Sequence, residues 1–425
     1  MSHEIDRRGF LGAAGAALLS SRVDGAVLGA NDKLVVGVMG TGGRGTSLAE
    51  SFSKETGVEV AYVCDVDSGR AGKAADLLSK LEKPTPKVVG DFRRILDDKA
   101  VDLLVIAAAD HWHAPATILA CSAGKHVYVE KPCSHNPREG EWMVEAARKH
   151  DRVVQLGTQR RSWPGIIEGM QAVHSGEIGR AYLATCRYAA NRGSIGVGKA
   201  GTPPADLDYE LWQGPAPRRP FRDNYLHYNW HWFWHWGTGE IGNNGVHYLD
   251  LCRWALQVDY PTRVSSSGGR YHFRDDQETP DTHFVGFDFE GGKSAVFEGV
   301  SCSPWYPGTP GNEIVIHGDK GSLSITNTGC TIRDLSGKKT LRTTAGKGGD
   351  AVHIADFLSA VREKKRPHAE IEEGHKSTLL CHLGNIAHRV GRSLTCDPKN
   401  GRILGDAAAA EHWGREYAPG WEPKV

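Results

Sequence analysis

The sequence has no excess of charge of either sign. Its 425 residues include 51 Lys and Arg and 51 Asp and Glu, so the formal net charge is zero. Proteins that bind nucleic acid or an anionic bilayer by charge need a surplus of basic residues to neutralise the phosphates. We therefore expect no nucleic acid among the partners of this protein.

Paired cysteines are also missing. The nine cysteines are scattered along the chain without a C-x-x-C pair, and several lie in apolar runs, as Cys64 does behind Tyr62 and Val63. Disulfide frameworks and zinc sites need cysteines at short, regular spacings. The pattern predicts buried thiols that behave as small apolar side chains, and it predicts no metal site.

The N-terminus lacks an apolar run long enough to cross a membrane. Residues 6–19 contain two consecutive arginines, followed by a short run rich in alanine and glycine. This order is typical of a twin-arginine export signal. We expect residues 1–32 to be such a leader, the export machinery to be a partner, and the protein to be periplasmic or otherwise exported. Because no clean cleavage site follows, an uncleaved leader and an ordinary amphipathic segment both stay open.

What the sequence does have is length, glycine and tryptophan. At about 100–200 residues per domain, 425 residues correspond to two to four domains. The 52 glycines and 20 prolines stay below the proportion typical of disordered chains, and 40% of the residues are hydrophobic. The 12 tryptophans offer flat indole faces, which suit stacking against a sugar ring or a heterocycle.

A glycine-rich motif stands where a dinucleotide-binding loop requires it. An apolar, β-branched run over 34–39 precedes a G-x-G-x-x-G motif, and a helical pattern over 46–54 follows. A second apolar run ends at Asp65, at the spacing of an acidic residue that accepts the ribose hydroxyls. The helix N-terminus would supply N–H groups to the pyrophosphate. The expected cofactor contacts in this stretch are Gly40, Thr41, Gly42, Gly43, Arg44, Gly45 and Asp65.

The acidic residue also bears on which coenzyme binds. A carboxylate at Asp65 should repel a 2′-phosphate, so NAD is favoured, while Arg44 or Arg70 could reach such a phosphate and keep NADP open. A protein that folds before export must load its cofactor in the cytoplasm. We therefore expect the cofactor to be tightly bound.

Strand and helix patterns then alternate up to residue 156. Apolar runs over 101–108, 126–130 and 152–156 are separated by helical stretches over 114–123 and 137–150. This alternation predicts a doubly wound, mostly parallel sheet whose ligand lies at the carboxyl ends of the strands.

Two polar motifs fall at those strand ends. Asp110 and His113 follow one strand, and Glu130, Lys131 and Pro132 follow the next. We expect Asp110, His113 and Glu130 to contact the cofactor. Pro132 restricts Lys131 to extended geometry, which would aim its ammonium at the hydride centre, where it could exchange a proton with a hydroxyl or carbonyl. An ordinary surface lysine before a turn is the alternative.

These residues resemble a known family. The glycine motif, Asp65, the run over 120–127 and Glu130-Lys131-Pro132 together are similar to the Gfo/Idh/MocA oxidoreductases, from about residue 33 to the C-terminus. The resemblance implies a Rossmann domain, a second domain with an open, largely antiparallel sheet, and NAD(P) in the cleft. It also implies sugars, polyols or their derivatives as substrates, with the family's essential lysine at Lys131.

The second half shows longer β-rich stretches and a helical C-terminal part. The predicted fold is α/β, a Rossmann domain followed by an α+β domain. The expected boundaries are a leader at 1–32, the Rossmann domain at 33–157, a substrate and oligomerisation domain at 158–345, and C-terminal helices and tail at 346–425. An open sheet with an apolar face favours a homo-dimer or homo-tetramer.

Tryptophan alternates with histidine and phenylalanine over 230–236, which predicts extended chain. His231 and His235 would then lie about 13 Å apart and could not share a metal. On a helix they could, together with His227. Aromatic packing and sugar stacking by at least one indole ring both stay open, and we name Trp236 and His235 as candidate substrate contacts.

A helical stretch after Gly239 carries the remaining candidates. Many members of the family that this sequence resembles show Asp-x-Gly-x-His-x-x-Asp here, and the histidine and final aspartate fall on His247 and Asp250. The first aspartate is Asn243 in this chain. Because an amide gives an imidazolium no ion pair, His247 should be less basic than in the usual pair. A structural histidine is the alternative.

The leading hypothesis is an NAD(P)-dependent oxidoreductase acting on a carbohydrate hydroxyl. His247, with Asn243 beside it, would remove the hydroxyl proton and Lys131 would polarise the oxygen or relay that proton. Further substrate contacts are expected from Arg160, Trp236, His235 and Asp250. Two rivals stay open: a redox-neutral, NAD-dependent glycoside hydrolase or lyase resembling α-N-acetylgalactosaminidases, and a non-catalytic NAD- or sugar-binding protein.

Overall fold

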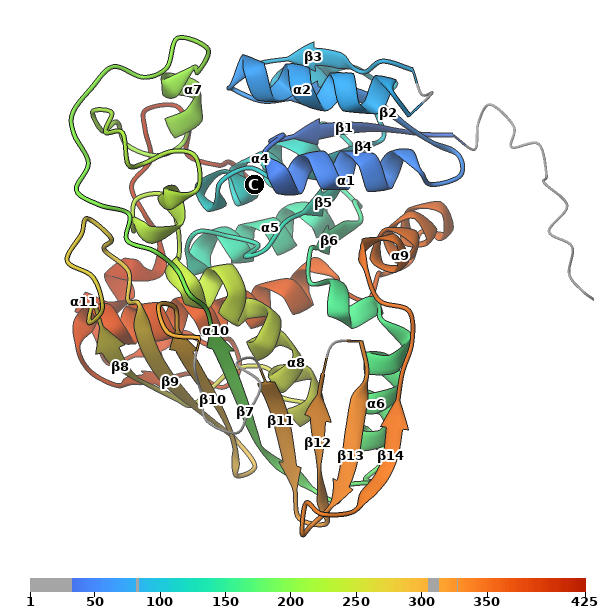
Figure 1. Ribbon diagram of the computed structural model, residues 1–425, viewed down its shortest axis with the longest axis vertical. Helices are drawn as coiled ribbons and strands as arrows, with labels where there is room; N and C mark the ends of the chain where they lie inside the picture. The colour runs from blue at the N-terminus through green and yellow to red at the C-terminus, as the bar shows by residue number, and fades with distance from the viewer. Residues whose placement is uncertain (1–32, 82–83, 305–312, 327) are drawn as a thin grey trace, which may run out of the picture. The chain divides into compact units, whose positions relative to one another are not determined.

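A six-stranded parallel sheet forms the first half of the protein (Figure 1). The computed structural model describes residues 33–81, 84–304, 313–326 and 328–425, so the predicted leader lies outside the described residues. The strand order is β3-β2-β1-β4-β5-β6, and it reverses between β1 and β4. Open α/β sheets bind ligands at such a reversal. The strands are β1 (Leu34–Met39), β2 (Val58–Cys64), β3 (Lys87–Val89), β4 (Leu103–Ile106), β5 (His126–Val129) and β6 (Val154–Leu156).

Helices cover both faces of this sheet, which explains why its central strands are continuously apolar. One face packs against α1 (Gly43–Ser53), α2 (Ser68–Ser79) and α9 (Asp350–Glu363). The other packs against α3 (Arg93–Asp97), α4 (Asp110–Ser122) and α5 (Pro137–Lys149). Side-chain caps fix two helix starts: the Asp67 carboxylate accepts the Arg70 N–H at 3.0 Å, and the Asn136 side chain accepts the Glu139 N–H at 3.1 Å.

A ten-stranded sheet dominates the second half, in the order β14-β13-β12-β11-β7-β10-β9-β8-β15-β16. Every neighbouring pair is antiparallel except β7 and β10, which confirms the predicted fold class. The strands are β7 (Ala181–Ala189), β8 (Arg263–Gly269), β9 (Thr282–Phe289), β10 (Lys293–Val300), β11 (Glu313–Gly318), β12 (Gly321–Ile325), β13 (Cys330–Asp334), β14 (Thr340–Thr344), β15 (Leu394–Cys396) and β16 (Ile403–Leu404).

One face of the ten-stranded sheet is covered by helices. Apolar side chains of its strands share a core with α6 (Pro164–His174), α8 (Val246–Leu256) and α10 (Ile371–Val390). The other face is open to solvent, where Phe284 and Val296 are each 39% exposed. Within the described residues, the remaining helical segments are α7 (Tyr209–Gln213), α11 (Ala407–Ala410), three 3₁₀ turns at Gln159–Ser162, Asn229–Trp232 and Glu411–Trp413, and a π-helical turn at Ile241–Gly245 that leads into α8.

The tryptophan-rich segment is not extended, so that prediction is wrong. Asn229–Trp232 form a 3₁₀ turn, and two further turns follow, because the N–H groups of Phe233 and Trp236 donate to carbonyls three residues back, at 3.2 and 3.1 Å. The alternation instead reflects burial. Trp232 and Trp236 are buried, whereas Trp230 and Trp234 are only partly buried.

The prediction of buried thiols is confirmed. All nine cysteines are free, and eight of them are buried, with only Cys302 partly exposed. Within the described part of the chain, no helix is both long and apolar enough to cross a membrane.

Several buried histidines make the stability of this fold sensitive to acid. Burial lowers the pKa of His382 and His283 to about 3 and that of His375 to about 4, and it lowers the pKa of His111 and His135 well below the ordinary value. Histidine in an unfolded chain titrates near pH 6.5, so below this pH the unfolded state binds more protons than the folded state. The buried Asp110 carboxyl, whose pKa is raised to about 7, opposes this with one proton only.

We therefore expect the free energy of unfolding to be highest above about pH 6.5 and to fall steadily between about pH 6.5 and 5. Denaturant unfolding at pH 7.5, 6.5, 5.8 and 5.0 measures this slope. Replacing His382 by glutamine should make the slope shallower, because one buried imidazole is removed. A free energy of unfolding that does not change over this range would contradict the prediction.

Candidate active site

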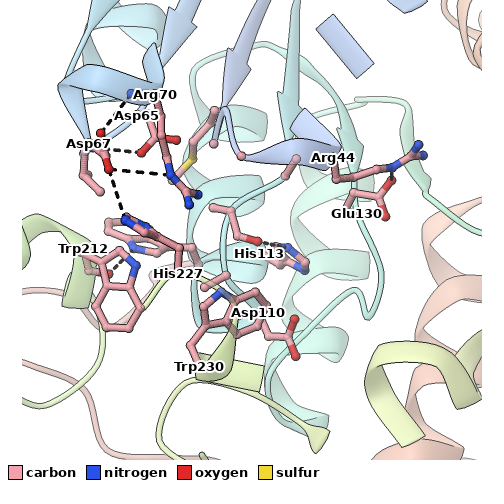
Figure 2. A pocket seen from close by; sticks show the side chains of 18 of the residues that line it. Arg44, Asp65, Asp67, Arg70, Asp110, His113, Glu130, Trp212, His227 and Trp230 are labelled. Atoms are coloured by element: carbon pink, nitrogen blue, oxygen red, sulfur yellow. Dashed lines mark hydrogen bonds and ion pairs between the residues drawn. The ribbon is translucent and has the colours of Figure 1, made fainter. Parts of the chain in front are cut away.

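Residues of both halves line one cavity of about 620 Å³, which lies at the carboxyl ends of β1, β2, β4 and β5. The first half contributes the glycine loop and the polar residues that follow each strand. The second half contributes a set that includes Trp212, His227, Tyr228, Trp230, His231, Asn243 and His247. Figure 2 shows part of this wall, with Trp212 and Trp230 facing the residues that follow the strands of the first half.

At Gly40 and Gly45 the glycine loop leaves no space for a side chain. Gly40 has a φ of +84°, and a Cβ there would lie 2.6 Å from the carbonyl oxygen of Ala107. A Cβ on Gly45 would lie 1.7 Å from the carbonyl oxygen of Gly40. Helix α1 begins at Gly43 without a side-chain cap, so its first N–H groups remain available to an anion. This loop fits the pyrophosphate of a dinucleotide.

Asp65 lies at the end of β2 beside this loop, where the sequence predicted it. One carboxylate oxygen accepts the N–H and the hydroxyl of Thr41, at 2.7 and 3.1 Å, and the other accepts the N–H of Asp67 at 3.0 Å. A carboxylate offers about four acceptor positions, so one remains for a ribose hydroxyl. Asp65 therefore both fixes the glycine loop and can bind the cofactor.

The two arginines that could bind a 2′-phosphate have different surroundings. Arg44 points toward Glu130, away from Asp65 (Figure 2), and donates to Glu130 at 2.7 Å and to both oxygens of Asp350 at 2.6 and 2.9 Å. Arg70 lines the cavity next to Asp65 and Asp67, with its Nε 3.7 Å from the Asp67 carboxylate. Among the two, Arg70 is the one placed to meet a phosphate on the ribose.

Lys131, Asn243 and His247 come together although more than one hundred residues separate the first from the other two. The Lys131 ammonium donates to the backbone carbonyl of Asn243 at 2.8 Å and to its side-chain oxygen at 3.2 Å. Asn243 lies in the π-helical turn, and His247 follows four residues later at the start of α8. The ammonium has three N–H donors, so one remains for a substrate oxygen.

The imidazole of His247 is neutral at pH 7. Burial, together with the positive charges of Lys131 and Arg160, lowers its pKa well below the ordinary value. This direction agrees with the weak basicity expected from an amide at position 243. A neutral imidazole can accept a proton, which is the role that the sequence suggested for it.

Two further polar side chains line the cavity next to Lys131. Asp110 is 1% exposed and accepts the Thr238 hydroxyl at 2.7 Å, and burial raises the pKa of its carboxyl to about 7. The ring nitrogens of His113 lie 2.6 Å from the carbonyl oxygen of Pro132 and 3.0 Å from that of Ala108. His113 therefore joins the two loops that follow β4 and β5, and its neutral ring donates its single N–H to one of these carbonyls.

Four predicted substrate contacts are not among the residues that line this cavity. Asp250 is buried, where it accepts the Arg161 guanidinium at 2.9 Å and the Ser377 hydroxyl at 2.6 Å. Trp236 is fully buried in an aromatic cluster. His235 Nε2 lies 2.7 Å from the Pro217 carbonyl oxygen. The Arg160 guanidinium lies over the Tyr248 ring, 5.3 Å from its centroid.

The structure adds cavity residues that sequence reasoning missed. His227 reaches from the second half to the Asp67 carboxylate, with 3.4 Å between Nε2 and Oδ2, as Figure 2 shows. The indole of Trp230 stacks on His231, with 3.5 Å between ring centroids. The density of aromatic residues over 225–236 marked this segment, but the pattern did not show which rings face the cavity.

Comparisons with known proteins agree with this architecture. Residues 34–158 match the family model described as "Oxidoreductase family, NAD-binding Rossmann fold", and residues 194–421 match "Oxidoreductase family, C-terminal alpha/beta domain". The fold is also similar to the WlbA dehydrogenase from Bordetella pertussis, solved in complex with NADH and UDP-GlcNAcA. That match has a TM-score of 0.66 at 18% identity and covers 86% of this chain and 99% of the other.

Curated relatives match parts of the chain. Inositol 2-dehydrogenase of Salmonella paratyphi B is 32% identical over 157 residues, which is 36% of this chain and 46% of that protein. Inositol 2-dehydrogenase 2 of Saccharopolyspora erythraea is 29% identical over 293 residues, 68% of this chain and 72% of that protein. A glycosyl hydrolase family 109 protein of Shewanella baltica is 30% identical over 173 residues, 35% of this chain and 38% of that protein.

The chain thus spans about half the length of the first of these relatives. The two family models together cover most of the chain, including the glycine loop, Lys131 and His247. The protein therefore belongs to the Gfo/Idh/MocA oxidoreductase family and carries its NAD-binding Rossmann domain.

Proposed function

We propose that this protein transfers a hydride between a hydroxyl-bearing carbon of a carbohydrate, meaning a sugar, a polyol or a derivative, and a nicotinamide cofactor, with NAD favoured over NADP. One observation carries the proposal: Lys131 and His247, from different halves of the chain, line the same cavity as the glycine loop. The inositol 2-dehydrogenase relatives support a polyhydroxylated substrate.

The side chains divide the work on the substrate hydroxyl. When bound, the nicotinamide supplies the hydride acceptor. Lys131 donates its remaining N–H to the substrate oxygen and stabilises the negative charge that develops there. His247, which is neutral, accepts the hydroxyl proton. The indole of Trp230 offers a flat apolar face on which a sugar ring can stack.

The cellular setting is part of the proposal. Arg7 and Arg8 support export by the twin-arginine route, with the cofactor loaded before export and tightly held. Phe284 and Val296 on the open face of the ten-stranded sheet support a homo-dimer or homo-tetramer that covers this face.

The decisive experiment uses purified protein without added cofactor. Acid releases any bound nucleotide, which chromatography identifies as NAD or NADP. The protein is then mixed with myo-inositol, D-glucose, D-galactose, N-acetyl-D-glucosamine, D-glucuronate and aryl glycosides while the NADH absorption band is recorded. NAD is then added in increasing amounts, and we expect NADH to accumulate in proportion to it with at least one sugar or polyol.

Two other results would replace the proposal. Release of the aryl group from an aryl glycoside by protein that carries bound NAD, without net NADH, would establish the redox-neutral hydrolase or lyase. No bound nucleotide and no spectral change with any sugar would favour the binding protein. The relative named as a glycosyl hydrolase matches little more than a third of this chain. We therefore propose the oxidoreductase rather than the hydrolase.

A further inference from the structure

Asn243 makes contacts that the aspartate common at this position could not make. Its side-chain nitrogen donates to the Tyr228 hydroxyl oxygen at 3.3 Å and to the Glu240 carboxylate at 3.4 Å, while its side-chain oxygen accepts from Lys131. Glu240 is 3% exposed. An aspartate would lose both donated bonds and would place a second carboxylate against the buried one. The amide therefore connects Lys131 to Tyr228.

Tyr228 receives a second donor from the other side. The Arg192 guanidinium donates to the same hydroxyl oxygen at 3.2 Å and lies over the Tyr228 ring, with 5.6 Å from its carbon to the ring centroid. Arg192 is itself held by the Glu240 carboxylate. A phenol hydroxyl both accepts and donates hydrogen bonds. Because Arg192 and Asn243 both donate to its oxygen, the proton of Tyr228 remains to be donated elsewhere.

The ring of Tyr228 is positioned to use that proton in the cavity. Tyr228 lines the cavity together with Lys131, Asn243 and His247, and it is 49% exposed. His231 packs on its ring, with 4.4 Å between the ring centroids. Its orientation is thus fixed by two donors and a ring contact, whereas its hydroxyl proton has no acceptor among the described residues.

We infer that Tyr228 donates a hydrogen bond to one oxygen of the carbohydrate, next to the oxygen that Lys131 polarises, and that Asn243 is the positioning residue for both side chains. This inference rests on the proposed function for the identity of the ligand. It makes Tyr228 a determinant of specificity, because a donor that the bound ligand covers discriminates against a substrate that lacks the matching oxygen.

The test is a double-mutant cycle in which one oxygen is removed from the protein side chain and one from the ligand. Binding of the sugars and polyols in the panel to NADH-loaded protein is measured by calorimetry, and the tightest ligand is then compared with each of its monodeoxy analogues. Tyr228→Phe should weaken binding of the parent ligand about tenfold, and one monodeoxy analogue should bind wild type and variant equally. A merely structural role would weaken every analogue alike and would overturn the inference.

Two further variants complete the experiment. Asn243→Asp should weaken the parent ligand at least as much as Tyr228→Phe and should lose the same discrimination against that one analogue. Tyr271→Phe, at a tyrosine that is 70% exposed and outside the cavity, is the matched control and should change no affinity. An Asn243→Asp variant that keeps the discrimination would overturn the role of Asn243.

Binding and turnover separate this inference from the proposed function. A wild-type protein that oxidises a sugar, with a Tyr228→Phe variant that binds every ligand normally, overturns the inference and leaves the function intact. A protein that binds sugars through Tyr228 but never reduces NAD supports the inference and overturns the oxidoreductase function. Absence of binding by any member of the panel overturns both.

Discussion

Replacing Lys131 with methionine should lower kcat for oxidation of the carbohydrate substrate by about 10²–10⁴-fold. In the wild type the ammonium donates to two oxygens of Asn243 and keeps one N–H for the substrate. Methionine has a similar length but no donor and no charge, so the developing negative charge on the substrate oxygen loses its stabilisation. Affinity for NADH, measured by fluorescence titration, should stay within about twofold, because the glycine loop and Asp65 are untouched.

Two companion variants separate charge from proton transfer. Lys131→Arg keeps the positive charge but cannot give up a proton at neutral pH, so a partial recovery relative to Lys131→Met indicates electrostatic stabilisation. Lys149→Met, on the exposed face of α5, is the matched control and should leave kcat unchanged. A Lys131→Met protein with normal turnover would remove Lys131 from the mechanism.

Strand and helix positions followed from the sequence where the pattern is local. Among the β-rich stretches that the sequence predicts in the second half, 282–289 and 293–300 coincide with β9 and β10, because one covered face favours alternation with a period of two. Strands β13 and β14 were not predicted. They are short, they lie toward one edge of the sheet, and they contain polar and charged residues such as Arg333 and Arg342, so periodicity alone did not reveal them.

Site residues were likewise predicted where local sequence fixes their position and missed where distant packing does. The glycine loop, Asp65 and Lys131 were predicted because each stands directly at a strand end, where the backbone fixes its position. Tyr228 and Trp212 were missed because they lie in turns and a short helix between β7 and α8, and only tertiary packing brings them to the cavity.

Distant partners bind the side chains of two candidates. Asp250 has the spacing of a substrate ligand, yet Arg161 and Ser377, from other helical segments, bind it in the interior. Arg44 follows the glycine motif, yet it pairs with Asp350, 306 residues away. Neither partner is marked by any motif near the residue that it binds. A charged side chain in a motif can therefore bind a distant residue of the protein instead of the ligand.

Replacing Gly45 with alanine should abolish tight cofactor binding and destabilise the fold by about 1–3 kcal/mol. The added Cβ would lie 1.7 Å from the carbonyl oxygen of Gly40 and 3.3 Å from the Cβ of Ala107. The first of these atoms belongs to the backbone of the dinucleotide loop, so the clash cannot be relieved by rotating a side chain. The loop must move away from α1, which displaces the N–H groups that face the pyrophosphate.

The matched control is another helical glycine. A Cβ added to Gly72 in α2 would meet no atom within 4 Å, so Gly72→Ala should raise the free energy of unfolding by about 0.5–1 kcal/mol through the better helix propensity of alanine. Urea unfolding compares the two variants, and NADH titration should show at least a hundredfold weaker binding for Gly45→Ala only. The same substitution is made on neighbouring helices of one sheet face. Changes of opposite sign in the free energy of unfolding would therefore identify the close approach of α1 to Gly40 as the cause. A Gly45→Ala protein that retains wild-type stability and NADH affinity would show that the loop can yield, and cofactor binding would then not depend on the close approach of Gly45 to Gly40.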